Sequence, residues 1–309
     1  MWAKPTVLKG GGTKSHGLRQ LLILRRIKML SIVEILKIIF IGIVEGVTEW
    51  LPISSTGHML LVDEFLSSAS LADEGFKNVF LYVIQLGAIL AVVILFWNKI
   101  FPFQFKDKRK SVIRANVFSM WFKVVVACIP GAIVTILFGD IIDKYLENPV
   151  TIAIALIFYG IVFIVVEIWN KKRKGYIVSS VDDITYKTAF LIGLFQVLSV
   201  VPGTSRSGAT IIGALLIGVS RVVAAEFTFF LAIPVMFGMS FLKVAKYVAD
   251  FGFNFSGEQI CILGIGTLVA FIVSIFIIKF LMAYIKRHDF RIFGWYRIIL
   301  GIIVLICMF

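Results

Sequence analysis

The sequence predicts an all-α integral membrane protein, with six transmembrane helices and two re-entrant helix-loop-helix hairpins arranged as an inverted-topology repeat. The first observation behind this fold class is composition. Hydrophobic residues make up 60% of the 309 residues, charged residues only 16%, and the mean hydropathy is +0.99. A soluble domain of this length is far more polar. The other two observations are long apolar windows separated by charged loops, and two apolar segments with polar breaks.

Residues 1–28 are expected to be a disordered extension, and residues 29–309 a single polytopic domain. The extension contains three consecutive glycines and scattered Lys and Arg. A signal peptide is disfavoured because no small-residue cleavage site follows the basic region. Ser31 and Glu34 have the spacing of a capping box, so a helix is predicted to begin there, with the Glu34 side chain reaching back to the Ser31 backbone.

Six apolar windows are long enough to cross the hydrocarbon layer, which takes about 20 residues. They cover residues 79–97, 117–138, 150–168, 224–242, 260–281 and 293–309. The three cysteines lie singly inside apolar windows, so they predict neither a disulfide framework nor a metal cluster.

The charged loops predict an orientation. Lys and Arg concentrate in residues 99–114, 171–174 and 286–291, which should face the cytoplasm. The alternate loops lean acidic and should lie outside; they are residues 67–74, 140–147 and 250–258. The net charge of +13 is therefore a topology signal rather than an indication of nucleic-acid binding.

Two further apolar segments are interrupted by polar residues. Residues 33–66 are broken at Pro52, and residues 186–217 at Pro202 and Gly203. Each half is too short to span with its polar middle, so each segment should enter and leave by one face, the first from outside and the second from the cytoplasm.

Each predicted hairpin precedes three spans, which divides the chain into halves of about 31–170 and 184–309. Such inverted repeats place a polar site near the midplane of the membrane. A weak echo supports the division: Leu51-Pro-Ile-Ser-Ser-Thr-Gly57 resembles Val201-Pro-Gly-Thr-Ser-Arg-Ser207 when the prolines are aligned. The alternative is that both stretches are ordinary breaks rich in Pro, Ser and Gly.

Glu45 and Glu49 are four residues apart, so they share one face of a helix about 6 Å apart at Cβ. In a low dielectric such a pair needs a cation between the carboxylates, or a proton on one of them. The spacing therefore predicts a divalent-metal site or a general base. The structural alternative is that the carboxylates snorkel or pair with a lysine, but the nearest cation in the sequence, Lys37, is two turns away.

Three hydroxyls and a histidine follow the first break, in Ser54-Ser55-Thr56-Gly57-His58. Pro52 should end one helix and leave these hydroxyls at the N-terminus of the next, where backbone N–H groups and the helix dipole favour an anion. Helix capping accounts for one hydroxyl, and it does not explain all three together with the histidine.

The second break contains Gly203-Thr204-Ser205-Arg206-Ser207-Gly208-Ala209-Thr210. An arginine in an apolar environment needs a counter-charge, and its planar fork suits phosphate oxygens. Glycines allow close approach of a ligand, and Ser205, Ser207 and Thr210 can donate to it. The alternative is a structural ion pair between Arg206 and Glu49.

Four other polar residues in or near the apolar windows receive weaker assignments. Gln85 should make a helix–helix hydrogen bond. Glu167 and Arg221 lie near span ends, where snorkelling suffices. Glu226 either pairs with Arg221 or supports the second break.

Together, the motifs from Glu45 to His58 and from Pro202 to Thr210 resemble the bacitracin-resistance family of undecaprenyl-diphosphate phosphatases. The resemblance extends from about Met29 to the C-terminus. It implies hydrolysis of undecaprenyl diphosphate to undecaprenyl phosphate and inorganic phosphate, in the bacterial cell (inner) membrane. That reaction recycles the lipid carrier of peptidoglycan synthesis and confers bacitracin resistance.

The resemblance also implies a divalent cation, Mg²⁺ or Ca²⁺, held by Glu45 and Glu49. The catalytic residues expected are Glu45, Glu49, Ser55, His58 and Arg206. The residues expected to bind the diphosphate are Ser54, Thr56, Gly203, Ser205, Arg206, Ser207 and Thr210. Two mechanisms stay open: attack by Ser55 with His58 or Glu49 as base, and direct attack by water with Glu49 as base.

Two other functions stand beside this one. A type 2 phosphatidic-acid-phosphatase-like enzyme needs a histidine several residues after its Ser-Arg pair, and none follows Arg206 at that spacing. A polyprenyl-phosphate transporter or flippase would share the inverted-repeat architecture. The sequence leaves open the oligomeric state, including a homodimer.

Overall fold

The computed structural model describes residues 31–66, 68–104, 112–173 and 175–308. The extension predicted for residues 1–28 lies outside them. The described residues form helices, with two isolated β-bridges as their only extended pairing. The first half contains α2 (Ile32–Thr48), α3 (Ser55–Phe65), η1 (Ala69–Leu71), α4 (Glu74–Leu95), α5 (Trp97–Ile100), α6 (Ala115–Leu146) and α7 (Pro149–Lys171). The second contains α8 (Tyr186–Val197), η2 (Leu198–Val200), α9 (Arg206–Ile217), α10 (Arg221–Phe251), α11 (Gly257–Tyr284) and α12 (Arg291–Met308).

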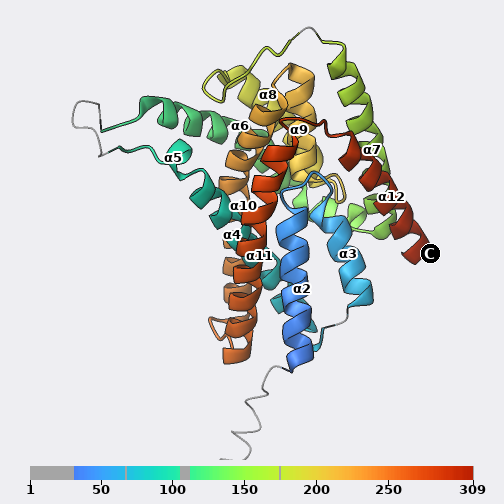
Figure 1. The fold of residues 1–309 in the computed structure, drawn as a ribbon. Helices are drawn as coiled ribbons and strands as arrows, with labels where there is room; N and C mark the ends of the chain where they lie inside the picture. The colour runs from blue at the N-terminus through green and yellow to red at the C-terminus, as the bar shows by residue number, and fades with distance from the viewer. Residues whose placement is uncertain (1–30, 67, 105–111, 174, 309) are drawn as a thin grey trace, which may run out of the picture.

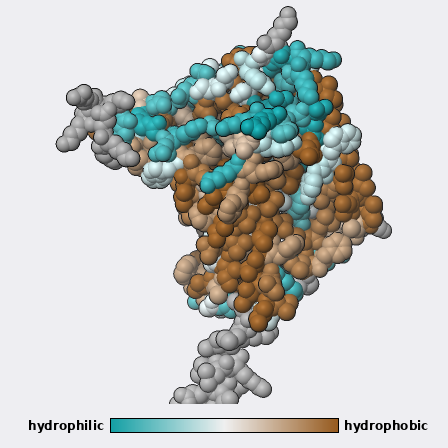
Figure 2. Space-filling model, in the orientation of Figure 1, coloured by the Kyte–Doolittle hydropathy of each residue, from teal (hydrophilic) through white to brown (hydrophobic). Residues whose placement is uncertain are grey.

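Six of these helices are long and apolar enough to cross a membrane, which confirms the six predicted spans. They are α4, α6, α7, α10, α11 and α12. Figure 2 shows hydrophobic residues covering the middle of the molecule, while hydrophilic residues gather at its upper end. The chain is therefore a multi-pass membrane protein.

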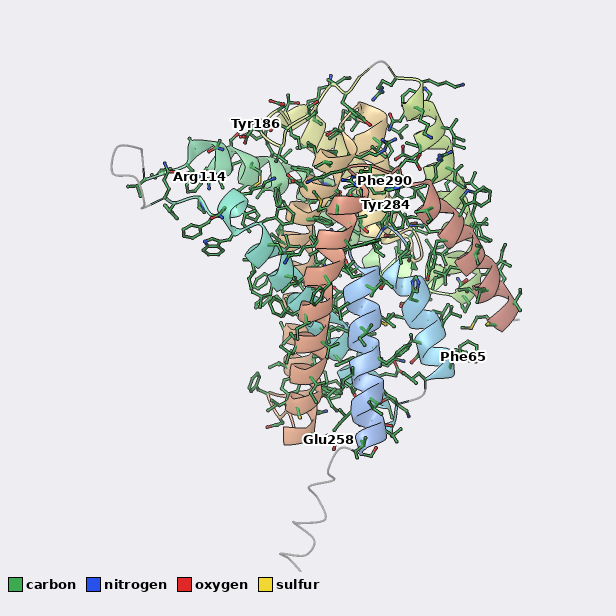
Figure 3. All side chains as sticks on the ribbon, in the orientation of Figure 1. Phe65, Arg114, Tyr186, Glu258, Tyr284 and Phe290 are labelled. Atoms are coloured by element: carbon green, nitrogen blue, oxygen red, sulfur yellow. The ribbon has the colours of Figure 1, made fainter. Side chains whose placement is uncertain are left out.

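The remaining long segments form two pairs of short helices. α2 and α3 flank the first break and run from it toward the lower side of the view, whereas α8 and α9 lie on the upper side (Figure 1). Figure 3 shows the same separation, with Phe65 at the end of α3 on the lower side and Tyr186 at the start of α8 on the upper side. These short helices cover the two apolar segments that the sequence predicts to be interrupted, and their re-entrant path through the membrane stays a prediction.

The start of α2 confirms half of the predicted capping box. Ser31 is the N-cap, and its hydroxyl accepts from the Glu34 N–H at 3.1 Å. The Glu34 side chain does not reach back to Ser31 as predicted. Its carboxylate accepts instead from Lys37, one turn further along α2, and from the Ser68 hydroxyl and the Ser70 N–H, which the segment before α4 brings close. This tertiary contact fixes the start of α2.

Glycines bring α2 close to α11. A Cβ added at Gly42 would lie 3.0 Å from the Gly266 carbonyl, and one at Gly46 would lie 2.9 Å from the Ala270 carbonyl. Small residues four apart allow this kind of close packing between membrane helices. Beyond the end of α2, Trp50 is fully buried with its ring edge-on to Phe229. The first break is thereby anchored in the apolar core.

Candidate functional site

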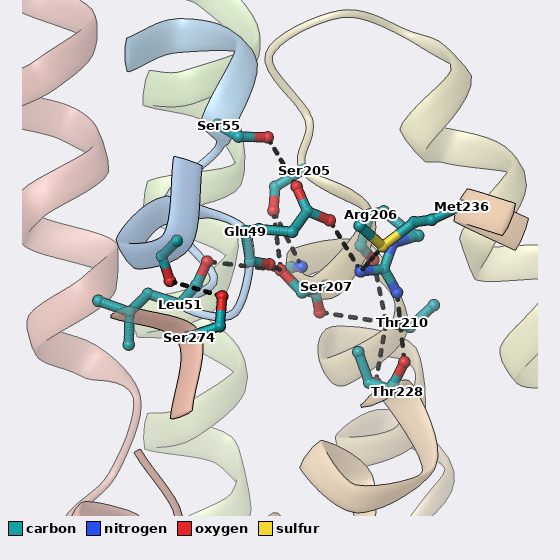
Figure 4. Close-up of polar contacts among 12 residues, drawn as sticks. Glu49, Leu51, Ser55, Ser205, Arg206, Ser207, Thr210, Thr228, Met236 and Ser274 are labelled. Atoms are coloured by element: carbon teal, nitrogen blue, oxygen red, sulfur yellow. Dashed lines mark hydrogen bonds and ion pairs between the residues drawn. The ribbon is translucent and has the colours of Figure 1, made fainter. Parts of the chain in front are cut away.

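The two breaks meet inside the protein. The Ser207 hydroxyl, at the start of α9, lies 3.4 Å from the carbonyl oxygens of both Glu49 and Leu51 in the first break. Figure 4 shows the side chains of the two breaks facing one another. Residues about 150 positions apart in the sequence therefore share one site.

Glu49 connects the two halves of this site. Its Oε1 accepts from Arg206 Nη2 at 2.9 Å, and its Oε2 accepts from the Ser55 hydroxyl at 3.0 Å (Figure 4). The Glu49 and Arg206 side chains are only 9% and 11% exposed. Arg206 also donates to the Thr228 carbonyl. The structural alternative for Arg206, an ion pair with Glu49, is thus present, and phosphate binding by Arg206 stays a prediction.

Glu45 is the more deeply buried of the two carboxylates. It is 2% exposed, and its Oε1 has no hydrogen-bond partner among the described residues. Gln85 of α4 lies near this carboxyl but forms no hydrogen bond with it, so the helix–helix hydrogen bond expected for Gln85 stays a prediction. An unpartnered carboxylate oxygen beside a second carboxylate is suited to a hard cation.

The donor set around these carboxylates limits what such a cation can be. The described residues contain no group of three or more His, Cys, Asp and Glu side chains placed to hold a metal. Two carboxylates would leave most of the coordination shell to phosphate oxygens and water, which is how Mg²⁺ binds beside phosphates. The residues therefore fit a divalent cation that binds together with a phosphate ligand.

Each break ends in the same unusual cap. Ser54 (φ 73°, ψ 101°) precedes α3 and Ser205 (φ 70°, ψ 122°) precedes α9, and each hydroxyl accepts from the N–H of the glycine three residues on. A positive φ is rare for serine and costs about 1–3 kcal/mol. These caps pair Ser54 with Ser205, one residue away from the register obtained by aligning the prolines. Both strained serines place a helix N-terminus at the site.

His58 lies one turn into α3 and is held from both sides. Its Nδ1 is 2.7 Å from the Ser54 carbonyl, and its Nε2 is 2.7 Å from the hydroxyl of Tyr296, whose ring stacks on the imidazole. Both ring nitrogens therefore have partners other than Ser55. The contact of Ser55 with Glu49 favours Glu49 over His58 as the group that takes a proton from Ser55.

Arg297 of α12 is the main residue that sequence reasoning missed. It is fully buried and donates from Nη2 to the carbonyls of Gly203 (2.9 Å) and Thr204 (2.8 Å), and from Nη1 to that of Pro52 (3.4 Å). One guanidinium thus holds both breaks. An arginine inside the last apolar window is itself a signal of function, and it could have found this residue.

Four of the predicted diphosphate-binding residues have other contacts or surroundings in the structure, and a role for them in binding diphosphate stays a prediction. The Ser54 hydroxyl caps α3, and the Thr56 side chain is exposed. Gly203 has φ 89°, and a Cβ there would lie 2.6 Å from the Ile152 carbonyl. The hydroxyl of Thr210 is buried against the carbonyls of its own helix and accepts from Thr228. Arg206 and Ser207 of the second break contact Glu49 directly, and the Ser205 hydroxyl lies 3.2 Å from that of Ser207.

Two weaker assignments prove wrong. Glu167 and Arg221 do not snorkel: Glu167 is fully buried, and Arg221 Nη2 donates to it at 2.6 Å, because the helix packing leaves the carboxylate no path to solvent. Glu226 pairs with neither Arg221 nor the second break. It accepts from Lys99 at 2.7 Å, since α5 brings that lysine against α10.

Comparison with known proteins decides the family. The family model described as bacitracin resistance protein BacA matches residues 38–303. The chain belongs to this family. A BacA relative from Enterococcus faecalis named undecaprenyl-diphosphatase is 64% identical over 277 residues, covering 90% of this chain and 98% of the relative. Relatives of that name from Desulfitobacterium hafniense and Lachnoclostridium phytofermentans are 58% and 59% identical, covering 90% and 89% of this chain and 97% of each relative.

Proposed function

We propose that this chain hydrolyses undecaprenyl diphosphate to undecaprenyl phosphate and inorganic phosphate in the bacterial cell membrane. The observation that carries the proposal is the position of Glu49, which accepts from Ser55 of one break and from Arg206 of the other. The relatives named undecaprenyl-diphosphatase match nearly the whole chain, which supports the same reaction. Hydrolysis returns the lipid carrier to peptidoglycan synthesis and counteracts bacitracin.

The fold proposed for this activity has two re-entrant hairpins and an inverted repeat, with halves of about 31–170 and 184–309. Helices α3 and α9 have 11 and 12 residues, whereas a helix needs about 20 residues to cross a bilayer. The matching serine caps support an equivalence between the two breaks. All proposed catalytic residues come from one chain, so the reaction requires no second copy; cross-linking in membranes tests for a homodimer.

The proposed reaction starts when the diphosphate replaces Glu49 as the ion-pair partner of Arg206. Its phosphate oxygens compete with Glu49 for the guanidinium, and this exchange leaves Glu49 free to act as a base. The Ser55 oxygen then attacks the terminal phosphorus, its proton passes to Glu49, and the bond to the bridging oxygen breaks. Undecaprenyl phosphate leaves, and water hydrolyses the phosphoserine to release phosphate. Direct attack by water is the competing mechanism, with the same base.

The helix N-termini after the two strained serines are proposed to bind the phosphate groups, together with the hydroxyls of Ser205 and Ser207. Backbone N–H groups in the first turn of a helix favour an anion. His58 is proposed to exchange the Tyr296 hydroxyl for a phosphate oxygen as the partner of Nε2, and this donation requires a protonated imidazole because Nδ1 already donates to the Ser54 carbonyl. Arg297 fixes the carbonyls of both breaks and so positions the two helix starts.

Glu45 and Glu49 are proposed to hold Mg²⁺ or Ca²⁺. When bound, the cation would neutralise charge on the transferring phosphoryl group. The unpartnered Glu45 oxygen supports this assignment. Addition of EDTA is therefore expected to abolish phosphate release, and Mg²⁺ or Ca²⁺ should restore it.

The deciding experiment measures phosphate release from a C55 diphosphate by the purified chain. Wild-type protein should release phosphate, and Arg206→Ala should not. If wild-type protein releases none while vesicles containing it move polyprenyl phosphate between leaflets, the flippase alternative replaces the phosphatase. A ³²P-labelled seryl adduct trapped on quenching would establish attack by Ser55; a wild-type rate in Ser55→Ala would exclude it.

A further inference from the structure

A polar cavity lies away from the site described above. It has a volume of about 780 Å³ and is bounded by the end of α7, the start of α10 and the connection from α11 to α12. Figure 3 labels Tyr284 and Phe290 at this connection. None of the proposed catalytic or diphosphate-binding residues lines the cavity, so the phosphatase reaction leaves it without a role.

The cavity carries an excess of positive charge. Its lining includes one carboxylate, that of Asp289, and five cationic side chains: Lys171, Arg173, Arg221, Arg287 and Arg291. Asp289 is paired with Arg291 at 2.9 Å and with Lys171 at 3.3 Å. Buried Glu167 neutralises Arg221.

Two guanidinium groups of the lining remain without a carboxylate among the described residues. Arg173 donates to the carbonyls of Leu215 and Leu216 and lies over the Trp169 ring. Arg287 is an exposed residue of the lining. Their charge is therefore available to an anion. The fork geometry of a guanidinium favours an anion with several oxygens, such as phosphate.

An unsatisfied amide points to the same conclusion. Asn170 lines the cavity and is 6% exposed, yet neither Oδ1 nor Nδ2 has a hydrogen-bond partner within the described part of the chain. Burying an amide without partners is unfavourable, and such groups are satisfied by a ligand or ordered water. An oxygen-rich ligand in the cavity would accept from this amide.

The rim of the cavity is apolar. Trp295 and Ile292 of α12 line it and are 58% and 56% exposed, and the exposed Tyr176 also belongs to the lining. Tyr and Trp favour the boundary between hydrocarbon and water. An apolar rim beside a cationic cavity suits a lipid, with its headgroup inside and its acyl chains along α12.

We propose that this cavity binds the phosphate headgroup of an anionic lipid. Asn170, Arg173 and Arg287 donate to the phosphate oxygens, and Trp295 and Ile292 pack against the acyl chains. Basic cavities between transmembrane helices on the cytoplasmic side are suited to such headgroups. A free phosphate would share the same polar contacts but gain nothing from the apolar rim, which is why we assign a lipid.

The test is native mass spectrometry of the full chain in detergent, titrated separately with phosphatidylglycerol, phosphatidylcholine and inorganic phosphate. Phosphatidylglycerol should bind in preference to the other two. Arg287→Glu should weaken its binding about tenfold or more, because it reverses a charge that contacts the phosphate. Asn170→Leu should weaken it about threefold. Lys286→Glu makes the same charge change at an adjacent exposed residue outside the lining, and it should bind as wild type does.

Three outcomes would overturn the assignment. Equal binding of phosphatidylglycerol to Arg287→Glu and to wild type would show that the lipid does not bind in this cavity. Equal binding of phosphatidylcholine would show that the headgroup charge is not recognised. If inorganic phosphate displaces phosphatidylglycerol at equal concentration, the ligand of the cavity is a free anion rather than a lipid. Unchanged phosphate release from C55 diphosphate by Arg287→Glu shows that this variant is folded.

Discussion

Arg206 and Glu49 form an ion pair across 157 positions of the chain, with Nη2 and Oε1 2.9 Å apart. This pair joins the two helix breaks and leaves the second Glu49 oxygen in contact with Ser55. A buried carboxylate shared between a cation and a hydroxyl can release one partner when a competing anion arrives. The pair is therefore both a structural connection and the proposed point at which substrate binding activates the base.

Loss of the Glu49 carboxylate should stop the reaction. Glu49→Gln is expected to lower kcat by about 10²–10⁴, the usual contribution of a general base. Arg206→Lys should keep charge but lose the fork, and it should raise KM more than Glu49→Gln does. Both effects are measured by phosphate release from C55 diphosphate. Glu64→Gln alters an exposed carboxylate and serves as the control; a wild-type kcat in Glu49→Gln would contradict the assigned role.

Removal of Arg297 should disorder both breaks together. Arg297→Ala leaves the carbonyls of Pro52, Gly203 and Thr204 without their donor, at about 1–3 kcal/mol for each buried unpaired group. Thermal unfolding in detergent should move to lower temperature, and phosphate release should be lost. Arg297→Lys has fewer N–H donors than the wild-type arginine, so its unfolding temperature and its phosphate release should lie between those of Arg297→Ala and wild type. A stable, fully active Arg297→Ala would show that the breaks hold their shape without it.

The strained cap at Ser205 can be separated into its two parts. Ser205→Ala loses the hydroxyl that accepts from Gly208 but keeps a side chain at positive φ, whereas Ser205→Gly loses the hydroxyl and relieves the strain. The Ala variant should therefore be about 1 kcal/mol less stable than the Gly variant. Chemical unfolding of the two proteins side by side measures this difference. Equal stability would mean that the backbone strain at Ser205 has no energetic cost.

Glu34 should make the protein sensitive to acid. It lies at the start of α2, outside the six membrane-spanning helices. Burial acts to raise its pKa, but hydrogen bonds from Ser68, Lys37 and Ser70 outweigh burial and lower it from 4.5 to about 2. A pKa that is lower in the folded state stabilises that state at pH values above the pKa of the unfolded chain. This stabilisation is lost as the pH falls toward the pKa of the folded state.

Wild-type protein should accordingly be more stable than Glu34→Gln at neutral pH, and the difference should shrink as the pH falls from about 5 toward 2. Thermal unfolding in detergent across this range measures the effect. A difference between the two proteins that does not change with pH would show that the carboxylate charge is not what holds residues 68–70 against α2.

The local part of the site could be predicted from the chain alone. Glu45 and Glu49 share a helix face because they are four residues apart, and the proline breaks put Ser55 and Arg206 at helix starts. The partners of these residues could not be predicted in the same way. Tyr296 reaches His58 across 238 positions, and Arg297 reaches Pro52 across 245, through packing that no local spacing encodes.

The sequence by itself determined the number of spans, the position of both breaks and the family, because hydropathy and local motifs are properties of neighbouring residues. Only the tertiary structure decided which charges meet: Glu49 with Arg206, Glu167 with Arg221 and Glu226 with Lys99. The physical reason is that a buried charge needs a partner, but the helix packing determines which partner comes within reach.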